Sequence, residues 1–258
     1  MRKQVGGYQM EGIRYKRAFL KLSGEALAKK NDDGSIAEIF DDGIIDSIAE
    51  EIAKCSEMGA QLGIMIGAGN IWRGRMGKGL DRARADHMGM LATTINCLRL
   101  QDSLLRIGCE AVVMTSVQMN SFSEIFSPDR AKEYLNEGRP VIFGCGAGIP
   151  FISTDTAGVV KALEIGAEII LMAKNVDGVY SADPNVVPDA VRFRRISYKE
   201  CLERELKATD ASASAIAREN GIDTLVFSLK EKDAIINAVT GNASGTLITA
   251  DSLQAEIY

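Results

Sequence analysis

The sequence predicts a three-layer α/β/α sandwich with a mainly parallel central sheet. Short apolar segments alternate with longer amphipathic segments along most of the 258 residues. The short segments are apolar throughout rather than at every second position, which is typical of parallel strands covered on both faces. Three of them also run into loops rich in small residues. Such a sheet is expected to bind its ligand where loops leave the carboxyl ends of the strands.

The first part of the chain is expected to form two strands around a helix. Residues 17–23 (RAFLKLS) are an apolar run with one lysine, and residues 61–70 (QLGIMIGAGN) are a strand that enters a glycine loop. Between them a helix is expected at 41–59, ending at Gly59. Its apolar residues at helical spacing are Ile44, Ile48, Ile52 and Cys55.

The middle of the chain repeats the alternation. A long helix is expected at 84–108, followed by a strand at 110–116 and a short helix at 128–138 that begins with Pro128. One side of the long helix carries Met90, Thr94, Cys97 and Leu98.

The last part of the chain adds further strands and helices. Two of the five prolines and several turn residues lie in 175–197, which indicates an insertion with a hairpin. The other expected elements are a strand and glycine loop at 140–148, a helix at 155–167, a strand at 168–174, helices at 198–206 and 209–220, a strand at 223–229, a short helix, and a final strand near 245–249. We expect one domain over residues 15–258 and a flexible extension at 1–14.

Composition and charge limit the classes of partner. The formal net charge of −5 argues against a general binder of nucleic acid or anionic membranes. No apolar run approaches the roughly 20 residues of a membrane-spanning helix, and the polar N-terminus lacks the apolar core of a secretory signal. We expect a cytoplasmic protein that binds neither nucleic acid nor membrane.

The cysteines and the single histidine give little indication of a disulfide or a metal site. The five cysteines are dispersed and contain no CxxC pair, which favours reduced thiols in a cytosolic core. Cys145 is of interest because it lies in a glycine-rich loop. The single histidine, His87, has no second histidine with which to bind a metal and is interpreted as an ordinary helix residue.

Three strand-end loops indicate an anion site. Glycines let the backbone approach a ligand, and free N–H groups at a following helix attract phosphate. The patterns GxxxxGK[ST] and GxGxxG after the first strand are both absent, which argues against a P-loop or Rossmann enzyme. The three loops are KLSGEA, IGAGNIWRG and GCGAGIPFISTDTA.

Charged residues near these loops have two interpretations each. Lys21 shares a strand face with Phe19 and is either a lysine whose ammonium reaches solvent at the strand end or one wall of an anion site. Asp155 and Asp210 each precede a helix rich in small residues and are either N-caps or carboxylates that orient Lys21 or a magnesium–phosphate complex. A basic cluster either lies in a solvent-exposed loop or provides an arginine that binds phosphate in bidentate fashion. It comprises Arg73, Arg75, Lys78, Arg82 and Arg84.

Several motifs together resemble the bacterial uridylate (UMP) kinase family of the amino acid kinase superfamily. The resemblance runs in order from about Tyr15 to Ile248. Two of the motifs, DHMGMLAT and PFxSTD, separate UMP kinases from their acetylglutamate, carbamate and aspartate kinase relatives. The motifs are KLSGEAL, GAGNIWRG, DHMGMLAT, GIPFISTDTAG, NVDGVYSADP and ELKATD.

The resemblance implies an amino acid kinase-like fold, a homohexamer, and Mg²⁺-dependent transfer of a phosphoryl group from ATP to UMP in pyrimidine nucleotide biosynthesis. It further implies regulation by GTP, as activator, and UTP, as inhibitor. Residue by residue it implies catalytic roles for Lys21, Arg73, Asp155 and Asp210. It implies ATP contacts from Lys21, Leu22, Ser23, Gly24, Gly69, Arg73, Asn175, Tyr180 and Asp183. It implies UMP contacts from Ala68, Asp86, Ala147, Gly148, Ile149, Pro150, Phe151, Ile152, Ser153 and Thr154, and no protein metal ligand.

Four positions depart from the family pattern. Ala68 replaces a glycine of many relatives, and Ala147 replaces a threonine. Lys174 stands where enterobacterial sequences have threonine, and Pro128 stands at the position of an aromatic residue that contacts GTP in some relatives. A side-chain contact to uracil at position 147 must therefore come from elsewhere, and the exact ATP contact around Lys174 and the details of GTP regulation do not carry over from the family.

The implied chemistry agrees with the residues. A phosphate acceptor is already ionised near neutral pH, so its phosphorylation requires positioning and charge neutralisation rather than a general base. Two alternatives remain: another kinase of the superfamily, with acetylglutamate, carbamate or aspartate as acceptor, and a non-catalytic nucleotide-binding or storage protein on the same fold. Because aspartate kinases usually need a C-terminal regulatory extension and the sequence ends soon after its last expected strand, we do not expect an aspartate acceptor.

Overall fold

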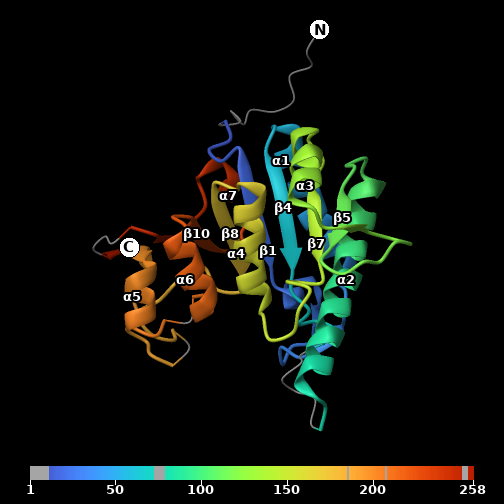
Figure 1. Ribbon diagram of the computed structural model, residues 1–258. Coiled ribbons are helices and arrows are strands. Elements are labelled where there is room, and N and C mark those ends of the chain that lie inside the picture. The colour runs from blue at the N-terminus through green and yellow to red at the C-terminus, as the bar shows by residue number, and fades with distance from the viewer. Residues whose placement is uncertain (1–11, 73–78, 185, 207, 252–254) are drawn as a thin grey trace.

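The structure is a computed structural model that describes residues 12–72, 79–184, 186–206, 208–251 and 255–258. It confirms the expected α/β/α layers (Figure 1). The strands of the central sheet are β1 (Arg17–Leu22), β4 (Gln61–Ile66), β5 (Val112–Thr115), β6 (Glu124–Ile125), β7 (Val141–Gly144), β8 (Ile169–Lys174), β9 (Phe193–Ser197), β10 (Asp223–Ser228), β11 (Gly245–Thr249) and β12 (Glu256–Ile257). A separate hairpin consists of β2 (Lys29–Lys30) and β3 (Ile36–Glu38).

Helices lie on both sides of this sheet. They are α1 (Asp42–Glu57), α2 (Arg82–Arg106), α3 (Pro128–Asn136), α4 (Thr154–Ile165), α5 (Tyr198–Glu203), α6 (Ala211–Glu219) and α7 (Ala234–Thr240), with a 3₁₀ turn, η1, at Gly24–Leu27. Within the described residues, the sheet order is β12-β9-β11-β10-β8-β1-β4-β7-β5-β6. The block from β10 to β6 is parallel throughout, so its strands all end at one edge.

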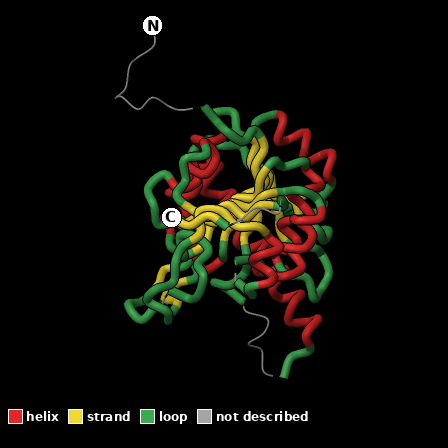
Figure 2. The backbone as a smooth tube through the Cα atoms, turned by 90° about the vertical axis from the view of Figure 1, so that its left-hand side faces the viewer, coloured by secondary structure: helices red, strands yellow, loops and turns green. Residues whose placement is uncertain are grey.

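The two faces of the sheet carry separate cores because strand side chains alternate. On β1, Leu20 points into a core shared with α1, α2 and α7, while Phe19 points into a core shared with α3 to α6. Phe19 stacks on Phe143 there, with ring centroids 5.7 Å apart. Figure 2 shows the strands as a central band between the two helical layers. The apolar strands of the sequence are therefore covered on both faces, as predicted.

Most of the described helices have a polar N-cap residue. The side chain of each N-cap accepts a backbone N–H of the first turn, which satisfies one of the otherwise unpaired donors of a helix start. These N-caps are Asp41, Asp81, Ser127, Ser153, Ser197 and Asp210. Ser153 and Asp210 thereby fix the starts of α4 and α6, both of which lie at the carboxyl edge of the sheet.

Two expectations about the elements need correction, and four short strands were not expected. On the apolar face of α1, Ile48, Ile52 and Cys55 are buried as expected, but Ile45 is buried in place of Ile44, which is 41% exposed. Within its described residues, the hairpin expected in 175–197 is reduced to an isolated antiparallel bridge, Tyr180 to Arg192, before β9 joins the central sheet beside β11. Sequence analysis did not foresee β2, β3, β6 or β12, which are two- or three-residue strands and too short for a periodic signal.

Both ends of the described chain contact the domain. The backbone N–H of Arg14 donates to the carbonyl of Val239 at 3.1 Å. The division between residues 1–14 and 15–258 remains a prediction.

All five cysteines are free. Among the helices that the structure describes, none combines the length and apolar character needed to cross a membrane.

Candidate functional site

Lys21 and Asp155 form an ion pair at the carboxyl edge of the sheet. The ammonium of Lys21, on β1, lies 2.5 Å from Oδ1 of Asp155, in the first turn of α4. Their side chains are 12% and 19% exposed, so both charges are largely removed from water. The ammonium of Lys21 is therefore paired and largely buried rather than free in solvent, and its predicted place in an anion site stays a prediction.

The second acidic residue, Asp210, has a different role. Its Oδ1 accepts the N–H of Ala213 at 2.7 Å and the hydroxyl of Thr156 at 2.9 Å, and its Oδ2 accepts the hydroxyl of Ser153. Asp210 is thus the N-cap of α6 and also ties α6 to the start of α4. Asp155 is not an N-cap, because Ser153 occupies that position of α4. Asp155 thus pairs with Lys21 and Asp210 caps a helix, and the predicted catalytic roles of both residues stay predictions.

The charge of Asp155 is stabilised by two lysines. Burial by itself raises the pKa of this carboxyl, but the ammonium groups of Lys21 and Lys174 outweigh burial and hold the pKa below its ordinary value. Asp155 is therefore an anion at neutral pH, between two strand-end cations.

The first two glycine loops are in direct backbone contact. A Cβ on Gly24 would lie 2.3 Å from the carbonyl oxygen of Gly67 and 2.7 Å from the amide of Gly69, so a larger residue does not fit. The Gly67 N–H in turn donates to the Leu22 carbonyl at 2.9 Å. This close approach explains the glycines after β1 and β4 and brings Ser23, Gly24 and Gly69 to the same edge as Lys21.

A buried asparagine pair fixes the loop after β4 to α2. Asn96 Nδ2 donates to the Gly67 carbonyl at 2.7 Å and to Asn70 Oδ1 at 2.8 Å, while Asn70 Nδ2 donates to Asn96 Oδ1 and to the Ile39 carbonyl. Both side chains are 5% exposed or less. Sequence analysis missed this pair, since nothing in the pattern distinguishes a bracing asparagine from a surface one.

A cavity of about 120 Å³, here called the smaller cavity, opens between the loops after β4 and β7 and the start of α2. It is lined by Ala68, Ala85, Asp86, Gly89, Met90, Thr93, Gly146, Ala147, Ile149, Ile152 and Thr154. Six of these are among the ten predicted UMP contacts; Gly148, Pro150, Phe151 and Ser153 belong to the same loop but do not line the cavity. The assignment of the ligand remains a prediction.

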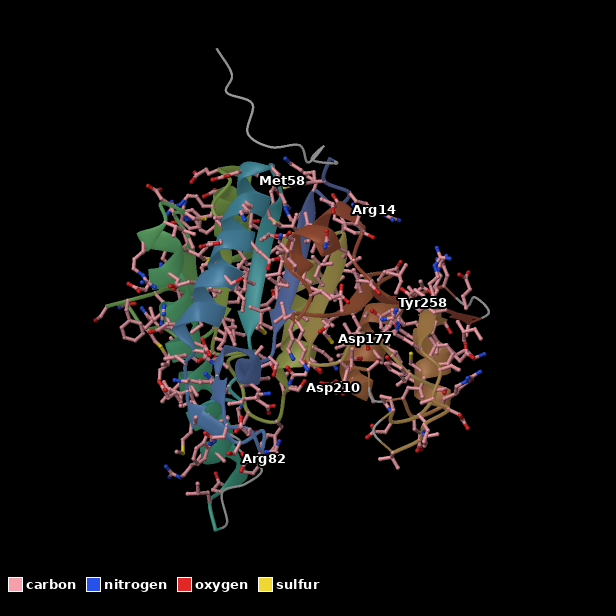
Figure 3. The ribbon with its side chains drawn as sticks, turned by 180° about the vertical axis from the view of Figure 1, so that it is seen from behind. Arg14, Met58, Arg82, Asp177, Asp210 and Tyr258 are labelled. Atoms are coloured by element: carbon pink, nitrogen blue, oxygen red, sulfur yellow. The ribbon has the colours of Figure 1, made fainter. Side chains whose placement is uncertain are left out.

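Asp86 connects the two walls of the smaller cavity. Its carboxylate accepts the Phe151 N–H at 2.9 Å and the Arg82 guanidinium at 3.0 Å. Phe151 has a positive φ of 69°, a conformation that is uncommon for a non-glycine residue and that the Asp86 contact helps to hold. The Phe151 ring is 65% exposed, and the Arg82 guanidinium lies 5.8 Å from its centroid. Figure 3 places Arg82 and Asp210 near the end of the molecule where the parallel strands finish.

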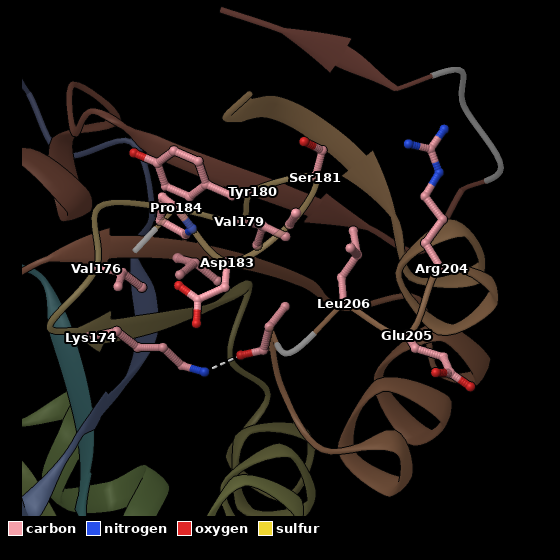
Figure 4. A pocket seen from close by; sticks show the side chains of 14 residues that line it. Lys174, Val176, Val179, Tyr180, Ser181, Asp183, Pro184, Arg204, Glu205 and Leu206 are labelled. Atoms are coloured by element: carbon pink, nitrogen blue, oxygen red, sulfur yellow. Dashed lines mark hydrogen bonds between the residues drawn. The ribbon is translucent and has the colours of Figure 1, made fainter. Parts of the chain in front are cut away.

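A second cavity, of about 430 Å³, lies on the other side of β1 and is here called the larger cavity (Figure 4). It is lined by Lys174, Val176, Gly178, Val179, Tyr180, Ser181, Ala182, Asp183, Pro184, Arg204, Glu205, Leu206, Ala208 and Val226. The predicted ATP contacts Tyr180 and Asp183 belong to this lining, whereas Asn175 is exposed and outside it. Sequence patterns did not predict the lining residues Lys174, Arg204, Glu205, Leu206 and Ala208, because the contact of β8 with the segment after α5 forms only in the folded domain.

Charged and aromatic groups support the segment that carries Tyr180 on the outer side of the larger cavity. Asp177 accepts the Tyr180 hydroxyl at 2.8 Å and pairs with the Arg192 guanidinium at 2.5 Å. Arg192 lies under the ring of Tyr258, 4.0 Å from its centroid, and the Tyr258 hydroxyl donates to the Gly245 carbonyl. Figure 3 shows Asp177 and Tyr258 on the same flank of the molecule.

The described side chains offer no dedicated metal cage. Within those residues, no group of three or more His, Cys, Asp or Glu is arranged to hold a metal ion. The acidic side chains nearest Lys21 and Lys174, Asp155 and Asp210, already bind protein groups. Magnesium in phosphoryl-transfer sites often binds mainly through substrate phosphates and water. We assign no protein ligand to a magnesium ion.

One predicted catalytic residue lies outside the described residues. Arg73, together with Arg75 and Lys78 of the basic cluster, falls in 73–78, and its predicted role stays a prediction. Of the described members, Arg82 lies beside the smaller cavity through its contact with Asp86, and Arg84 is exposed.

Comparison with known proteins supports the family prediction. Residues 16–228 match the amino acid kinase family. The structure is similar to that of UMP kinase from Bacillus anthracis, with 35% identity and a TM-score of 0.87 over 95% of this chain and 99% of that chain. It is also similar to UMP kinase from Ureaplasma parvum, with 35% identity and a TM-score of 0.85 over 92% of this chain and 100% of that chain.

A more distant similarity extends to the fold alone. Aspartate kinase from Synechocystis superposes with a TM-score of 0.66 at 18% identity, over 92% of this chain and 40% of that chain. The α/β/α sandwich is thus shared with a kinase that acts on a different acceptor.

Proposed function

The chain belongs to the amino acid kinase family, and from this premise we propose that it is a UMP kinase that transfers the γ-phosphoryl group of ATP to UMP, giving UDP and ADP. Near-full-length similarity at 35% identity to two UMP kinases supports this choice of acceptor within the family. The low identity to aspartate kinase gives no comparable support to an amino acid acceptor.

The observation that carries the proposal is the place of Lys21 between the two cavities. In the sheet, β1 lies between β8, which borders the larger cavity, and β4, which borders the smaller one. A donor nucleotide in the larger cavity and an acceptor nucleotide in the smaller one would meet at the end of β1. The ion pair of Lys21 with Asp155 holds an ammonium at that meeting point.

The described groups suit phosphoryl transfer without a general base. The acceptor oxygen of UMP is ionised near neutral pH, so the protein needs to align two nucleotides and offset the charge of the transferred group. Lys21 supplies positive charge, and the glycine loops after β1 and β4 offer backbone close to the same edge. Asp155 orients Lys21, and Asp210 keeps the starts of α4 and α6 together. Mg²⁺ bound with ATP would neutralise further phosphate charge.

The test is an acceptor panel under ATP and magnesium. Release of ADP is measured with UMP, CMP, acetylglutamate, carbamate, aspartate or no acceptor. We expect turnover with UMP to exceed turnover with every other acceptor by at least tenfold. Equal ADP release without acceptor, or a preference for acetylglutamate or carbamate, would refute the proposal. ATP binding with no transfer to any acceptor would favour a nucleotide-binding or storage protein.

We extend the proposal to regulation and assembly on the basis of the family resemblance. A homohexamer in the cytoplasm, activated by GTP and inhibited by UTP, is the expected state. Pro128 begins α3 where some relatives have a GTP-contacting aromatic residue, so the strength of GTP activation is expected to differ from theirs. Sedimentation velocity checks the oligomer, and initial rates with GTP or UTP check the effectors.

A further inference from the structure

The loop that follows β7 contains several residues with left-handed backbone. Cys145, Gly146, Gly148 and Phe151 have φ values of 62°, 51°, 78° and 69°. Glycine adopts such values freely, but for cysteine and phenylalanine they are uncommon and cost free energy. In the described part of the chain, only two further non-glycine residues share this conformation. Backbone strain of this kind persists only where neighbouring contacts hold it, and it is concentrated at functional sites.

Two threonines of α2 hold the first strained residue. The hydroxyl of Thr93 accepts the backbone N–H of Cys145 at 2.9 Å, and Oγ1 of Thr94 lies 3.2 Å from Sγ of Cys145, where either group can donate. Both threonines and Cys145 are 3% exposed or less. Without the Thr93 hydroxyl the Cys145 N–H would be buried and unpaired, which is costly. The left-handed conformation of Cys145 therefore depends on α2.

The same helix holds the second strained residue. The Phe151 N–H donates to the Asp86 carboxylate at 2.9 Å. Asp86 and Thr93 are seven residues apart on α2, which places them on the same face of the helix. This face of α2 thus holds both ends of the 145–151 loop.

The middle of the loop forms a wall of the smaller cavity. Gly146 and Ala147 line this cavity, and the Gly146 carbonyl accepts the Ser116 hydroxyl at 2.8 Å. Cys145 and Thr94 are not among the described residues that line it. A contact between Thr94 and Cys145 therefore affects the position of the wall without reaching into the cavity.

Thr93 lines the smaller cavity, but its hydroxyl is already engaged within the protein. It donates to the Met90 carbonyl at 2.6 Å and accepts the Cys145 N–H. A hydroxyl has a single hydrogen to donate. The arrangement of these bonds suits a group that holds the loop better than one that donates to a ligand.

We propose that Thr93 and Thr94 are positioning residues for the acceptor. They hold Cys145 in its left-handed conformation, so that the 145–151 loop has its binding shape before the acceptor arrives. A preformed loop spares the acceptor the cost of ordering it on binding. The proposal rests on the proposed function for the identity of that acceptor, UMP.

The first experiment compares Thr93→Val and Thr94→Val with Thr240→Val as a matched control. The Thr240 hydroxyl bonds only to α7 and the turn after it, and Thr240 lines neither cavity. We expect the KM for UMP to rise about tenfold in Thr93→Val and about threefold in Thr94→Val, which loses a weaker contact. The KM for ATP should stay within about twofold of wild type, and Thr240→Val should change neither KM.

A conservative variant separates the hydroxyl from the shape of the side chain. Thr93→Ser keeps the hydroxyl and should bring the KM for UMP to within about twofold of wild type. Wild-type KM values for UMP in both valine variants would overturn the proposal even if these variants were less stable, because lost stability alone indicates a structural contact. A rise in Thr93→Val without one in Thr94→Val would also overturn it, since Thr93 would then act on the acceptor directly.

Hydrogen exchange tests the loop in the wild-type protein and does not depend on the folding of any variant. The N–H groups of Cys145, Gly148 and Phe151 are all bonded within the protein. Without nucleotide, we expect them to exchange at least about 100-fold more slowly than in an unstructured peptide. Exchange at the unstructured rate, with protection only after UMP is added, would show that the loop is not preformed and would overturn the proposal.

The readouts separate failure of this inference from failure of the proposed function. If wild type shows no UMP-dependent turnover but the three N–H groups are protected without nucleotide, the acceptor is wrong and the preformed loop stands. If wild type converts UMP to UDP and both valine variants do so with the wild-type KM for UMP, the function stands and the positioning role is refuted.

Discussion

The two cavities flank the same strand but are held in shape in opposite ways. The smaller cavity is braced between its own walls: Asp86 joins the start of α2 to the loop after β7, and Asn96 joins α2 to the loop after β4. The larger cavity is braced from behind, where Asp177, Arg192 and Tyr258 support the segment that carries Tyr180. Removing a brace should therefore alter one cavity without the other, whereas a change at Lys21 should affect both.

The largest effect is expected from Lys21→Met, which acts at the junction of the two cavities. Loss of the ammonium removes charge stabilisation from the transferred group, so kcat should fall about 10²- to 10³-fold. The KM values for ATP and UMP should change much less than kcat. Steady-state kinetics with both substrates varied measures this, with thermal unfolding to confirm folding. A kcat near that of wild type would show that Lys21 is not at the reacting centre.

The next largest effect is expected from Asn96→Ala, which removes a brace of the smaller cavity. The Gly67 carbonyl and the Asn70 side chain would both lose a buried partner. We expect the free energy of unfolding to fall by about 2–3 kcal/mol, and the KM for UMP to rise more than the KM for ATP. Urea denaturation and steady-state kinetics measure the two effects. Asn220→Ala is a suitable control because Asn220 is exposed and bonds only within its own helix end.

The pH dependence of stability tests the charge of Asp155. Because its pKa is depressed in the folded protein, ionised Asp155 stabilises the fold above its ordinary pKa, and this contribution is lost as the pH falls through the folded pKa. Asp155→Asn should be less stable than wild type by about 1.5–3 kcal/mol at pH 7, and the difference should shrink at lower pH. Denaturant unfolding of both proteins across this range measures it. A difference that grows on acidification would contradict the ion pair.

The smallest effect is expected from Asp177→Asn, which weakens the outer brace of the larger cavity. The Asp177 side chain is 40% exposed, so its pair with Arg192 should contribute only about 1 kcal/mol. The KM for ATP should rise about fivefold at most, with the KM for UMP and kcat unchanged. An equal rise in both KM values would show that the two cavities are not independent. Asp189→Asn, on the same segment and exposed, is the control.

The sequence determined most of the fold because its signals are local. Apolar strands, helical spacing and the glycine loops predicted the parallel block of the sheet and the edge at which Lys21, Asp155 and Asp210 gather. Where the signal was weak the prediction failed: Ile44 and Ile45 are equally apolar, and only the packing of α1 in the folded domain decides which is buried. Short edge strands such as β6 and β12 exist because a neighbouring strand is in reach, which no periodicity records.

By itself the sequence thus determined the order of elements, the strand-end lysine and the glycines that allow two loops to touch. Only the tertiary structure decided which carboxylate pairs with Lys21 and which caps a helix, since Asp155 and Asp210 precede similar small-residue segments and differ in what packs against them. It also decided that Lys174 emerges on the same face of the sheet as Lys21, because that depends on the register of β8 against β1. Contacts between residues far apart in the chain follow from packing, and local sequence does not encode them.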